Sequence, residues 1–278
     1  MTNTRITILV ENTVYRGGLR AEHGLSIWLE TQDKKILFDT GQSDLLLHNA
    51  EAMGIDLAQA NAIVLSHGHY DHIGGLDRVL DLAPWANVYL HPLAIEPKFS
   101  ASNDATHEIG VTSALRDRLA DRIASGRGAY TETTTPILPG ATVTGPIPRV
   151  TEFEDVGGRF FLDSQGRQPD LLMDDQAMFL ETTQGLVVVL GCAHAGVVNT
   201  MEHIRHVAPS QRIHAVLGGM HLVHASEVRI QRTLDVFRRL GIDKIGPAHC
   251  TGWHAAKQMW SAFGEKCFIC CVGTQISF

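Results

Sequence analysis

The chain has 278 residues, of which 44% are hydrophobic and 19% charged, and its formal net charge is −7. This length and composition are typical of a globular protein with a sizeable core, and they exclude an intrinsically disordered chain. A negative charge without any block of Lys or Arg disfavours a nucleic-acid partner, because such a surface repels phosphate backbones. No apolar run approaches the roughly 18–20 residues that span a bilayer, so we expect no membrane partner either.

The N-terminal segment and the cysteines favour a cytoplasmic protein. Met1–Val10 is polar and then strand-like, without the features of a signal peptide. Five cysteines in a chain of this length fit a reducing compartment better than a disulfide framework. Three of them, Cys267, Cys270 and Cys271, lie close together in an apolar tail that no second CxxC follows. We therefore expect them to pack as small hydrophobic side chains and not to form half of a zinc knuckle.

The first third of the chain predicts strands with tight connections, followed by alternating helices and strands. Ser43 is a good N-cap for a helix that ends near Met53, where Gly54 stops it. Gln32-Asp33 predicts a hairpin turn between the second and third strands. The predicted strands are Arg5–Val10, Leu25–Thr31, Lys35–Asp39, Asn61–Ser66 and Asn87–Leu90, and a second helix is predicted over Ile73–Leu82.

The segment 92–136 breaks this pattern. It carries a polar stretch rich in Ser, Asn and Thr, and an amphipathic segment near Ala114–Ile123. Insertions at the ends of sheets often carry substrate specificity. We therefore predict one domain over residues 1–278, with an insertion or lid at about 92–136.

The remainder of the chain returns to alternating elements. Strands resume at Ala141, and Ala177–Glu181 pairs naturally with Leu186–Leu190 across a turn at Gln184-Gly185. Helices and strands therefore alternate in both halves, which predicts an α/β (α+β) fold of two sheets sandwiched between helices. The last third is predicted to contain helices over Val197–Val207, Glu227–Leu240 and Trp253–Phe263, and strands over Ile213–Leu217 and Lys244–Ile245.

A cluster of metal-binding residue types follows the strand at Asn61–Ser66. The chain has 15 histidines, and histidine is the commonest metal ligand in proteins. His67 and His69 can point the same way from an extended turn and so reach one ion, whereas Asp71 and His72 begin the next helix and can face a second ion. Zn²⁺ accepts such nitrogen and oxygen ligands at about 2.0–2.2 Å. Four potential ligand residues in six positions favour a metal site over a His-rich surface loop.

The pattern HxHxDH, from His67 to His72, resembles the signature of the metallo-β-lactamase superfamily. Leu37–Gly41 resembles the earlier strand-and-turn motif of the same superfamily, in which the aspartate, here Asp39, steadies the site. The resemblance implies an αββα sandwich with two divalent metal ions at one end of the sheets. Zinc is favoured by the imidazole-rich ligand set, and Mn²⁺ or Fe²⁺ are the alternatives.

The resemblance also implies ligands at later strand ends. His194 matches the third imidazole of the first metal, and His249 matches the last histidine of the second metal. Superfamily hydrolases usually place a bridging aspartate in a Gly-Asp pair, but this chain has Cys192 there, so either Cys192 or solvent and a histidine takes that role. For His221 the alternatives are a further ligand, a proton donor to the leaving group, a substrate contact and a core histidine.

One subgroup of the superfamily resembles this chain over nearly its whole length. It is the archaeal and bacterial branch of dihydropterin–aminobenzene ribofuranosyl phosphate synthases. Fold and metal site carry over from such a resemblance, whereas the substrate does not. The pieces that carry it are Ala21–Ser26, Thr144–Arg149, Asp174–Gln176, Gly191–Gly196, Gly218–Leu222 and His249–Gly252.

The expected activity is hydrolysis of a phosphoester or another small ester-like substrate by a metal-activated water. Asp71 would orient this water and take its proton, and His221 would stabilise the oxyanion or protonate the leaving group. The alternatives are a synthase that forms a C–C or C–N bond with release of pyrophosphate, and a ligand sensor with slow turnover. A flavodiiron-like redox centre is disfavoured, because that branch generally has Glu where this chain has His69.

The expected partner is a small, anionic molecule. Arg149 and His23 would either contact this molecule or have a structural role. The sequence leaves open whether the protein forms a homo-oligomer.

Overall fold

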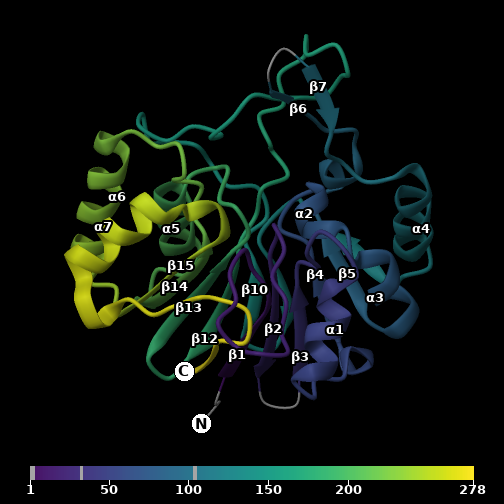
Figure 1. Cartoon of the computed structure of the whole chain (residues 1–278), viewed down its shortest axis with the longest axis horizontal. Coiled ribbons are helices and arrows are strands. Elements are labelled where there is room, and N and C mark those ends of the chain that lie inside the picture. Colours follow the sequence, from purple (N-terminus) through teal and green to yellow (C-terminus); the bar gives the residue numbers. More distant parts are fainter. Residues whose placement is uncertain (1–3, 32–33, 103–104) are drawn as a thin grey trace.

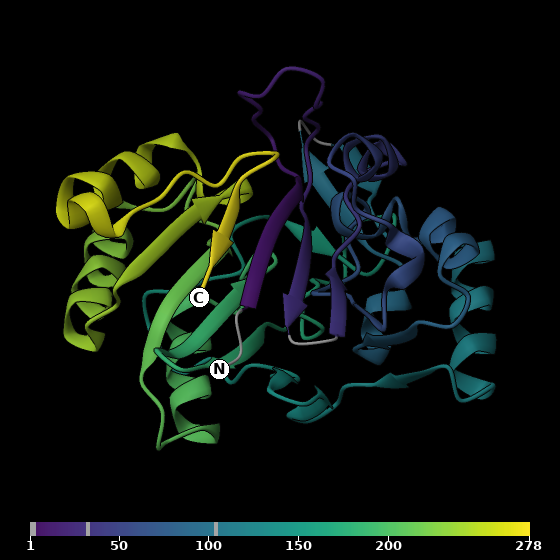
Figure 2. The ribbon, with the colours of Figure 1, turned by 90° about the horizontal axis from the view of Figure 1, so that it is seen from below.

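The computed structural model describes residues 4–31, 34–102 and 105–278, and in this part of the chain two large sheets pack face to face (Figure 1). Figure 2 shows that the C-terminal strand β16 lies beside β1 from the opposite end of the chain. In spatial order, the first sheet contains β16 (Gln275–Ser277), β1 (Thr4–Val10), β2 (Ser26–Thr31), β3 (Lys34–Phe38), β4 (Ala62–Val64), β5 (Asn87–Leu90) and β8 (Gly128–Tyr130). The second contains β15 (Lys244–Ala248), β14 (Ile213–Gly219), β13 (Gly185–Leu190), β12 (Met178–Thr182), β10 (Ala141–Val143) and β9 (Thr135–Leu138).

Helices cover the outer face of each sheet, so that the fold has four layers (Figure 1). The first sheet is covered by α1 (Leu45–Ala52), α2 (Tyr70–Ile73), α3 (Leu76–Leu82) and α4 (Ser113–Ala124). The second is covered by α5 (Val197–Val207), α6 (Glu227–Leu240) and α7 (Trp253–Phe263). Short 3₁₀ turns occupy Leu57–Gln59, Pro92–Ile95, His249–Thr251 and Gly264–Lys266.

The two-residue period of the strands divides their apolar side chains between two cores. In β13, Val188 packs with the helices α5–α7, whereas Val187 and Val189 pack against the other sheet. In β3, Leu37 likewise faces the helices and Phe38 faces the opposite sheet. Strands with both faces buried need continuous apolar runs, and each such side chain contributes about 1.5–3 kcal/mol to folding. The predicted α/β sandwich is confirmed.

The strand directions bring distant segments to one edge of the sandwich. β3 and β4 pair in parallel, as do β13, β14 and β15. The carboxyl ends of parallel strands meet at the same edge, which is where ligands of α/β folds bind. The segments that leave these strands contain Asp39, His67–His72, Cys192–His194, His221 and His249.

The predicted helix Ile73–Leu82 is instead two helices, α2 and α3, and the first begins at Tyr70. Gly74 and Gly75 separate them, because the backbone of the Thr40–Ser43 turn packs directly on both glycines. A β carbon on Gly74 would lie 1.9 Å from the carbonyl oxygen of Gln42. The predicted turn at Gln32-Asp33 lies outside the described residues, although β2 and β3 do pair antiparallel.

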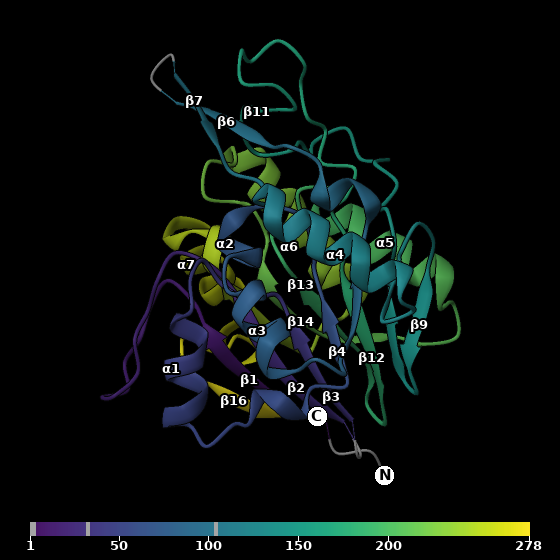
Figure 3. The ribbon, with the colours of Figure 1, turned by 90° about the vertical axis from the view of Figure 1, so that its right-hand side faces the viewer.

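The segment 92–136 has two parts. Its first part, β6 (Phe99–Ser102) and β7 (Ala105–Glu108), forms a small sheet with β11 (Phe160–Phe161) that stands above the sandwich (Figure 3). In its second part, α4 packs into the core cluster on the first sheet and β8 pairs with β5. Within the described residues of this segment, the hairpin stands above the edge where the parallel strands end, and its action as a lid stays a prediction.

The C-terminal cysteines pack as the sequence predicts. Cys267, Cys270 and Cys271 are all buried, and the first two belong to the cores on either face of the second sheet. Among the described residues, no helix combines the length and apolar character needed to cross a bilayer.

Candidate metal centre

Unusual backbone conformations gather at the edge where the strands end. Asp39, Ala193, His221 and His249 all have positive φ angles, between 46° and 56°. Each such residue costs roughly 1–2 kcal/mol, because its β carbon crowds the following carbonyl. Strain of this kind persists where the surroundings enforce it, and it concentrates at functional sites.

Three histidines form the first candidate ligand group. The ring centroid of His67 lies 4.5 Å from that of His69 and 4.9 Å from that of His194. The Nε2 atoms of all three rings are buried without a hydrogen-bond partner in the described part of the chain. A buried polar atom without a partner costs about 1–3 kcal/mol. A cation that accepts nitrogen ligands would remove this cost.

Hydrogen bonds on the far side of two of these rings fix their orientation. The Ser66 hydroxyl donates to Asp39 Oδ2 at 2.7 Å, so its oxygen is free to accept from Nδ1 of His67 at 2.9 Å. Nδ1 of His194 lies 2.8 Å from the carbonyl oxygen of Val156, which can only accept. With the proton on Nδ1, both rings present the lone pair of Nε2 to a metal.

A second candidate group surrounds Asp71. Its Oδ2 lies 3.2 Å from Nε2 of His249 and 3.7 Å from Nε2 of His72. Nε2 of His249 lies close to Asp71, but the angles are not those of a hydrogen bond. This atom has no hydrogen-bond partner among the residues described. Nδ1 of His72 lies 2.7 Å from Asp39 Oδ2, and Nδ1 of His249 lies 2.9 Å from Asn12 Oδ1. The exposed His23 also reaches Asp71, at 3.2 Å.

Cys192 lies between the two groups. Its sulfur is 3.1 Å from Nε2 of His72, and its ligand atom lies within 4.8 Å of those of His67 and His194 on one side and of His72 and His249 on the other. Thiolates are good ligands for zinc. The structure therefore brings Cys192 to the place where the sequence lacks a bridging carboxylate.

Burial and nearby charges shift the pKa of His72 in the opposite direction from the pKa values of His67, His69 and His194. Burial lowers the pKa values of His67, His69 and His194 well below the usual range, which leaves these rings neutral, as metal binding requires. Burial also lowers the pKa of His72, but the carboxylates of Asp71 and Asp39 outweigh it and raise the pKa to about 9. The donor set of imidazoles, a carboxylate and a thiol fits divalent zinc.

A buried ion-pair network supports the turn that carries His67 and His69. The Lys98 side chain is 1% exposed, and its Nζ donates to Asp170 and Asp174 at 2.9 Å each. The second oxygen of Asp174 accepts the backbone N–H of Gly68 at 2.9 Å. Burial lowers the pKa of Lys98, but the two carboxylates outweigh it and raise the pKa. Nothing in the sequence pattern singles out Lys98, although Asp174 stands in one of the subgroup's recurring pieces.

Asp175 and Arg149 hold the turn that carries His194. Asp175 accepts the backbone N–H of Ala195 at 2.8 Å, and burial raises its pKa to about 7. Arg149 donates to the carbonyl oxygens of His194 at 2.8 Å and Leu172 at 3.2 Å. Of the two alternatives for Arg149, these contacts favour the structural one.

His221 and Phe160 lie at the rim of the centre. The ring of His221 is 4.2 Å from that of His194, and its Nε2 is 3.1 Å from the carbonyl oxygen of Gly157. Phe160, from β11, lies over the histidines, with its ring centroid 5.0 Å from His69 and 5.2 Å from His194. No sequence pattern indicates Phe160, because it approaches from the small sheet above the sandwich. The alternatives for His221 stay open.

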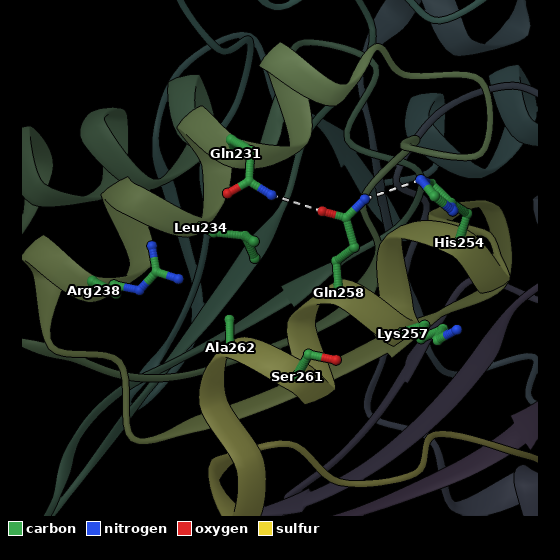
Figure 4. Close-up of a pocket in the computed structure, with 8 residues that line it drawn as sticks. All are labelled: Gln231, Leu234, Arg238, His254, Lys257, Gln258, Ser261 and Ala262. Atoms are coloured by element: carbon green, nitrogen blue, oxygen red, sulfur yellow. Dashed lines mark hydrogen bonds between the residues drawn. The ribbon is translucent and has the colours of Figure 1, made fainter.

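A hollow of about 370 Å³ between α6 and α7 contains none of these residues (Figure 4). Three of its polar side chains bond to one another, since Gln258 lies 2.8 Å from Gln231 and 2.9 Å from His254. His254 is exposed.

Comparisons with known proteins agree with this architecture. The family model of the metallo-beta-lactamase superfamily matches residues 19–249. The chain is 28% identical to 7,8-dihydropterin-6-methyl-4-(beta-D-ribofuranosyl)-aminobenzene-5'-phosphate synthase of Methanocaldococcus jannaschii, over 95% of this chain and 92% of that protein. It is 33% identical to an uncharacterized protein of the same archaeon, over 91% of this chain and 93% of the relative.

A solved structure has the same fold. The crystal structure of Tm1679, a metal-dependent hydrolase of the beta-lactamase superfamily, superposes with a TM-score of 0.81 at 30% identity and covers 98% of both chains. The superfamily and the name of the synthase relative indicate an enzyme, and members of the superfamily typically bind divalent metals. The chain belongs to the metallo-β-lactamase superfamily.

Proposed function

We propose that this protein is a binuclear, metal-dependent hydrolase that acts on a phosphoester or another small ester-like substrate. The observation that carries the proposal is a set of four buried Nε2 atoms that have no hydrogen-bond partner in the described residues and that surround one place in the fold. One ion would be held by His67, His69 and His194, and the other by Asp71, His72 and His249, with Cys192 between them.

A bound divalent cation supplies a water of lowered pKa and polarises the substrate oxygen. Asp71 acts as the acceptor for the proton of the attacking water. Although burial raises the pKa of Asp71, the charge of His72 and the contact with His23 outweigh it and hold this pKa well below the usual range, so the carboxylate is ionised. His221 borders the same space and contacts the leaving group, and Phe160 shields the site from bulk water.

Elemental analysis combined with turnover of a phosphodiester, thioester and lactone panel tests this proposal. We expect close to two zinc, manganese or iron ions per chain, and turnover that a chelator abolishes. His67→Ala should lower turnover by more than about 100-fold, since such an enzyme depends on its ions for the nucleophile. His254→Ala, on an exposed histidine of α7, is the matched control and should retain activity. Near-native turnover of folded, metal-loaded His67→Ala protein would sink the proposal.

A synthase is the second candidate, and the 28% identity to the dihydropterin relative over 95% of this chain favours it. In that reaction an aromatic acceptor would replace water, and pyrophosphate would leave. Product analysis with a pterin pyrophosphate separates the two candidates. Pyrophosphate release that requires the aromatic acceptor supports the synthase, whereas release without the acceptor supports the hydrolase. Bound metal without turnover on any substrate would instead favour a ligand sensor.

A further inference from the structure

A hollow of about 300 Å³ adjoins the candidate metal centre and is separate from its ligands. It shares a wall with the centre, because His221 lines it and packs 4.2 Å from the ring of His194. Residues 155–158 form another part of its lining. This volume is at the lower limit for ligand pockets, so the hollow fits one small group and not a whole substrate. Its lining residues are Asp155, Val156, Gly157, Gly158, His221, His224, Ala225 and Arg229.

The arginine in this wall is buried and only partly used. The Arg229 side chain is 4% exposed, and its Nη1 donates to Asp155 Oδ1 at 2.6 Å. Its Nε and Nη2 atoms are buried and have no hydrogen-bond partner within residues 4–31, 34–102 and 105–278. These two nitrogens form one edge of the guanidinium, which is the edge that binds an oxyanion with two parallel hydrogen bonds. Leaving them unpaired costs about 1–3 kcal/mol for each group.

The N-terminus of α6 adds to the attraction of Arg229 for an anion. Arg229 lies in the first turn of the 14-residue helix α6, whose N-terminus borders the hollow at Ala225. Helix N-termini attract anions through their free N–H groups and dipole. The one carboxylate among the lining residues belongs to Asp155, whose side chain is 74% exposed and is already paired with Arg229 and with the N–H of Gly157.

We propose that this hollow, the Arg229 pocket, binds an oxyanion group of the substrate, with phosphate as its best-fitting member, while the metal centre acts on a bond beside it. The loop that lines the pocket also orients the centre, since the carbonyl oxygen of Val156 holds Nδ1 of His194 and that of Gly157 contacts His221. Binding of the anion would therefore position the reacting bond. The role in substrate binding rests on the proposed hydrolase, whereas the anion site itself does not.

Titration of the full-length protein with inorganic phosphate tests the pocket, with binding measured by calorimetry. The titration is run on the metal-loaded protein and again after chelation, because phosphate that binds through metal ions does not bind to the chelated protein. We expect the chelated protein to bind phosphate, Arg229→Gln to weaken this binding by at least 10-fold, and Arg239→Gln to leave it unchanged. Arg239 is the matched control, since it lies on the same helix with its side chain 64% exposed.

Two further variants keep the test decisive if Arg229→Gln does not fold. Arg229→Lys retains the positive charge but lacks the two-nitrogen edge, so phosphate binding should still fall about 10-fold. Asp155→Asn removes the competing carboxylate at an exposed position and should strengthen phosphate binding several-fold. Acetate in place of phosphate shows whether the pocket prefers phosphate or accepts any oxyanion, and equal affinity for both would overturn the phosphate preference.

Two results would overturn the pocket itself: no phosphate binding by chelated wild-type protein at millimolar concentration, or equal phosphate affinity in wild type, Arg229→Lys and Asp155→Asn. Neither readout needs turnover. A protein that binds phosphate through Arg229 but hydrolyses nothing would refute the hydrolase and leave the anion site standing. If phosphate does not bind through Arg229 but metal-dependent turnover is intact, the anion site is refuted and the hydrolase stands.

Discussion

Asp39→Asn should weaken both metal binding and the fold, although it changes the side chain by a single atom. The Asp39 carboxylate is fully buried and accepts three hydrogen bonds of 2.7 Å, from the backbone N–H and the hydroxyl of Ser66 and from Nδ1 of His72. An amide has only one accepting oxygen, so either of its orientations points a donor at a donor. Losing one or two charge-assisted bonds lowers the free energy of unfolding by about 2–5 kcal/mol.

The weaker metal binding expected for Asp39→Asn follows from a change in the tautomer of His72. If the amide nitrogen faces Nδ1, that atom must accept, and the ring proton moves to Nε2, the atom aimed at Cys192 and Asp71. The lone pair needed for the ion is then lost, and loss of such an outer partner typically weakens metal binding by about 10–100-fold. A chelator-competition titration measures this affinity, and urea denaturation measures the stability.

The control is Asp235→Asn, which makes the same change on the surface of α6, where the side chain is 70% exposed and paired with Arg238. It should alter neither quantity by more than about 0.5 kcal/mol, as is usual for surface changes. Wild-type zinc affinity together with wild-type stability in Asp39→Asn would refute the assigned role of Asp39 in fixing His72.

Two further changes probe the supporting residues. Lys98→Met leaves the buried carboxylates of Asp170 and Asp174 unpaired, so the free energy of unfolding should fall by about 3–5 kcal/mol in urea denaturation. Asp175→Asn should change the pH dependence of stability in the chelated protein. Because burial raises the folded-state pKa of Asp175 to about 7, its folded form binds more protons than its unfolded form between about pH 4 and pH 7. Wild-type stability therefore falls relative to Asp175→Asn as pH rises through this window, by up to about 1.4 kcal/mol per pH unit, and levels off above it.

For the Lys98 and Asp175 variants, a specific result would contradict each prediction. Lys266→Met removes a half-exposed lysine 3.6 Å from Asp243, and such a surface pair is worth less than about 1 kcal/mol. Equal losses for the Lys266 and Lys98 variants would argue against a structural role for the buried pairs. For Asp175, parallel stability curves of the two proteins from pH 4 to pH 8 would show that its carboxyl is not perturbed.

Local patterns in the sequence determined most of the elements and the first group of candidate ligands. Continuous apolar runs such as Leu186–Leu190 predict strands buried on both faces, and this strand separates its side chains into the two cores. The boundaries of α5, α6 and α7 agree with the predicted ranges, because the 3.6-residue period and the capping residues act within a few positions. The resemblance carried by His67–His72 led to the superfamily, which the family match confirmed.

The roles of the candidate ligands stay proposals, but their convergence was decided by tertiary structure. The backbone N–H of Gly68 meets Asp174 across 106 residues, and that of His249 meets Glu11 across 238. No periodic pattern encodes such pairs, because they depend on which strand ends share an edge and on how closely the backbones pack there. Lys98, Phe160 and Arg229 belong to this class.

What the sequence by itself determined is therefore the set of chemical groups and the strands and helices that carry them. Only the folded chain decided that Asp39 and Ser66 orient the rings, that Cys192 lies between two candidate ligand groups, and that one edge of Arg229 has no partner among the described residues. The physical reason is range: hydrophobic periodicity and capping act between near neighbours, whereas the partner of a buried polar atom is set by the packing of the whole sandwich.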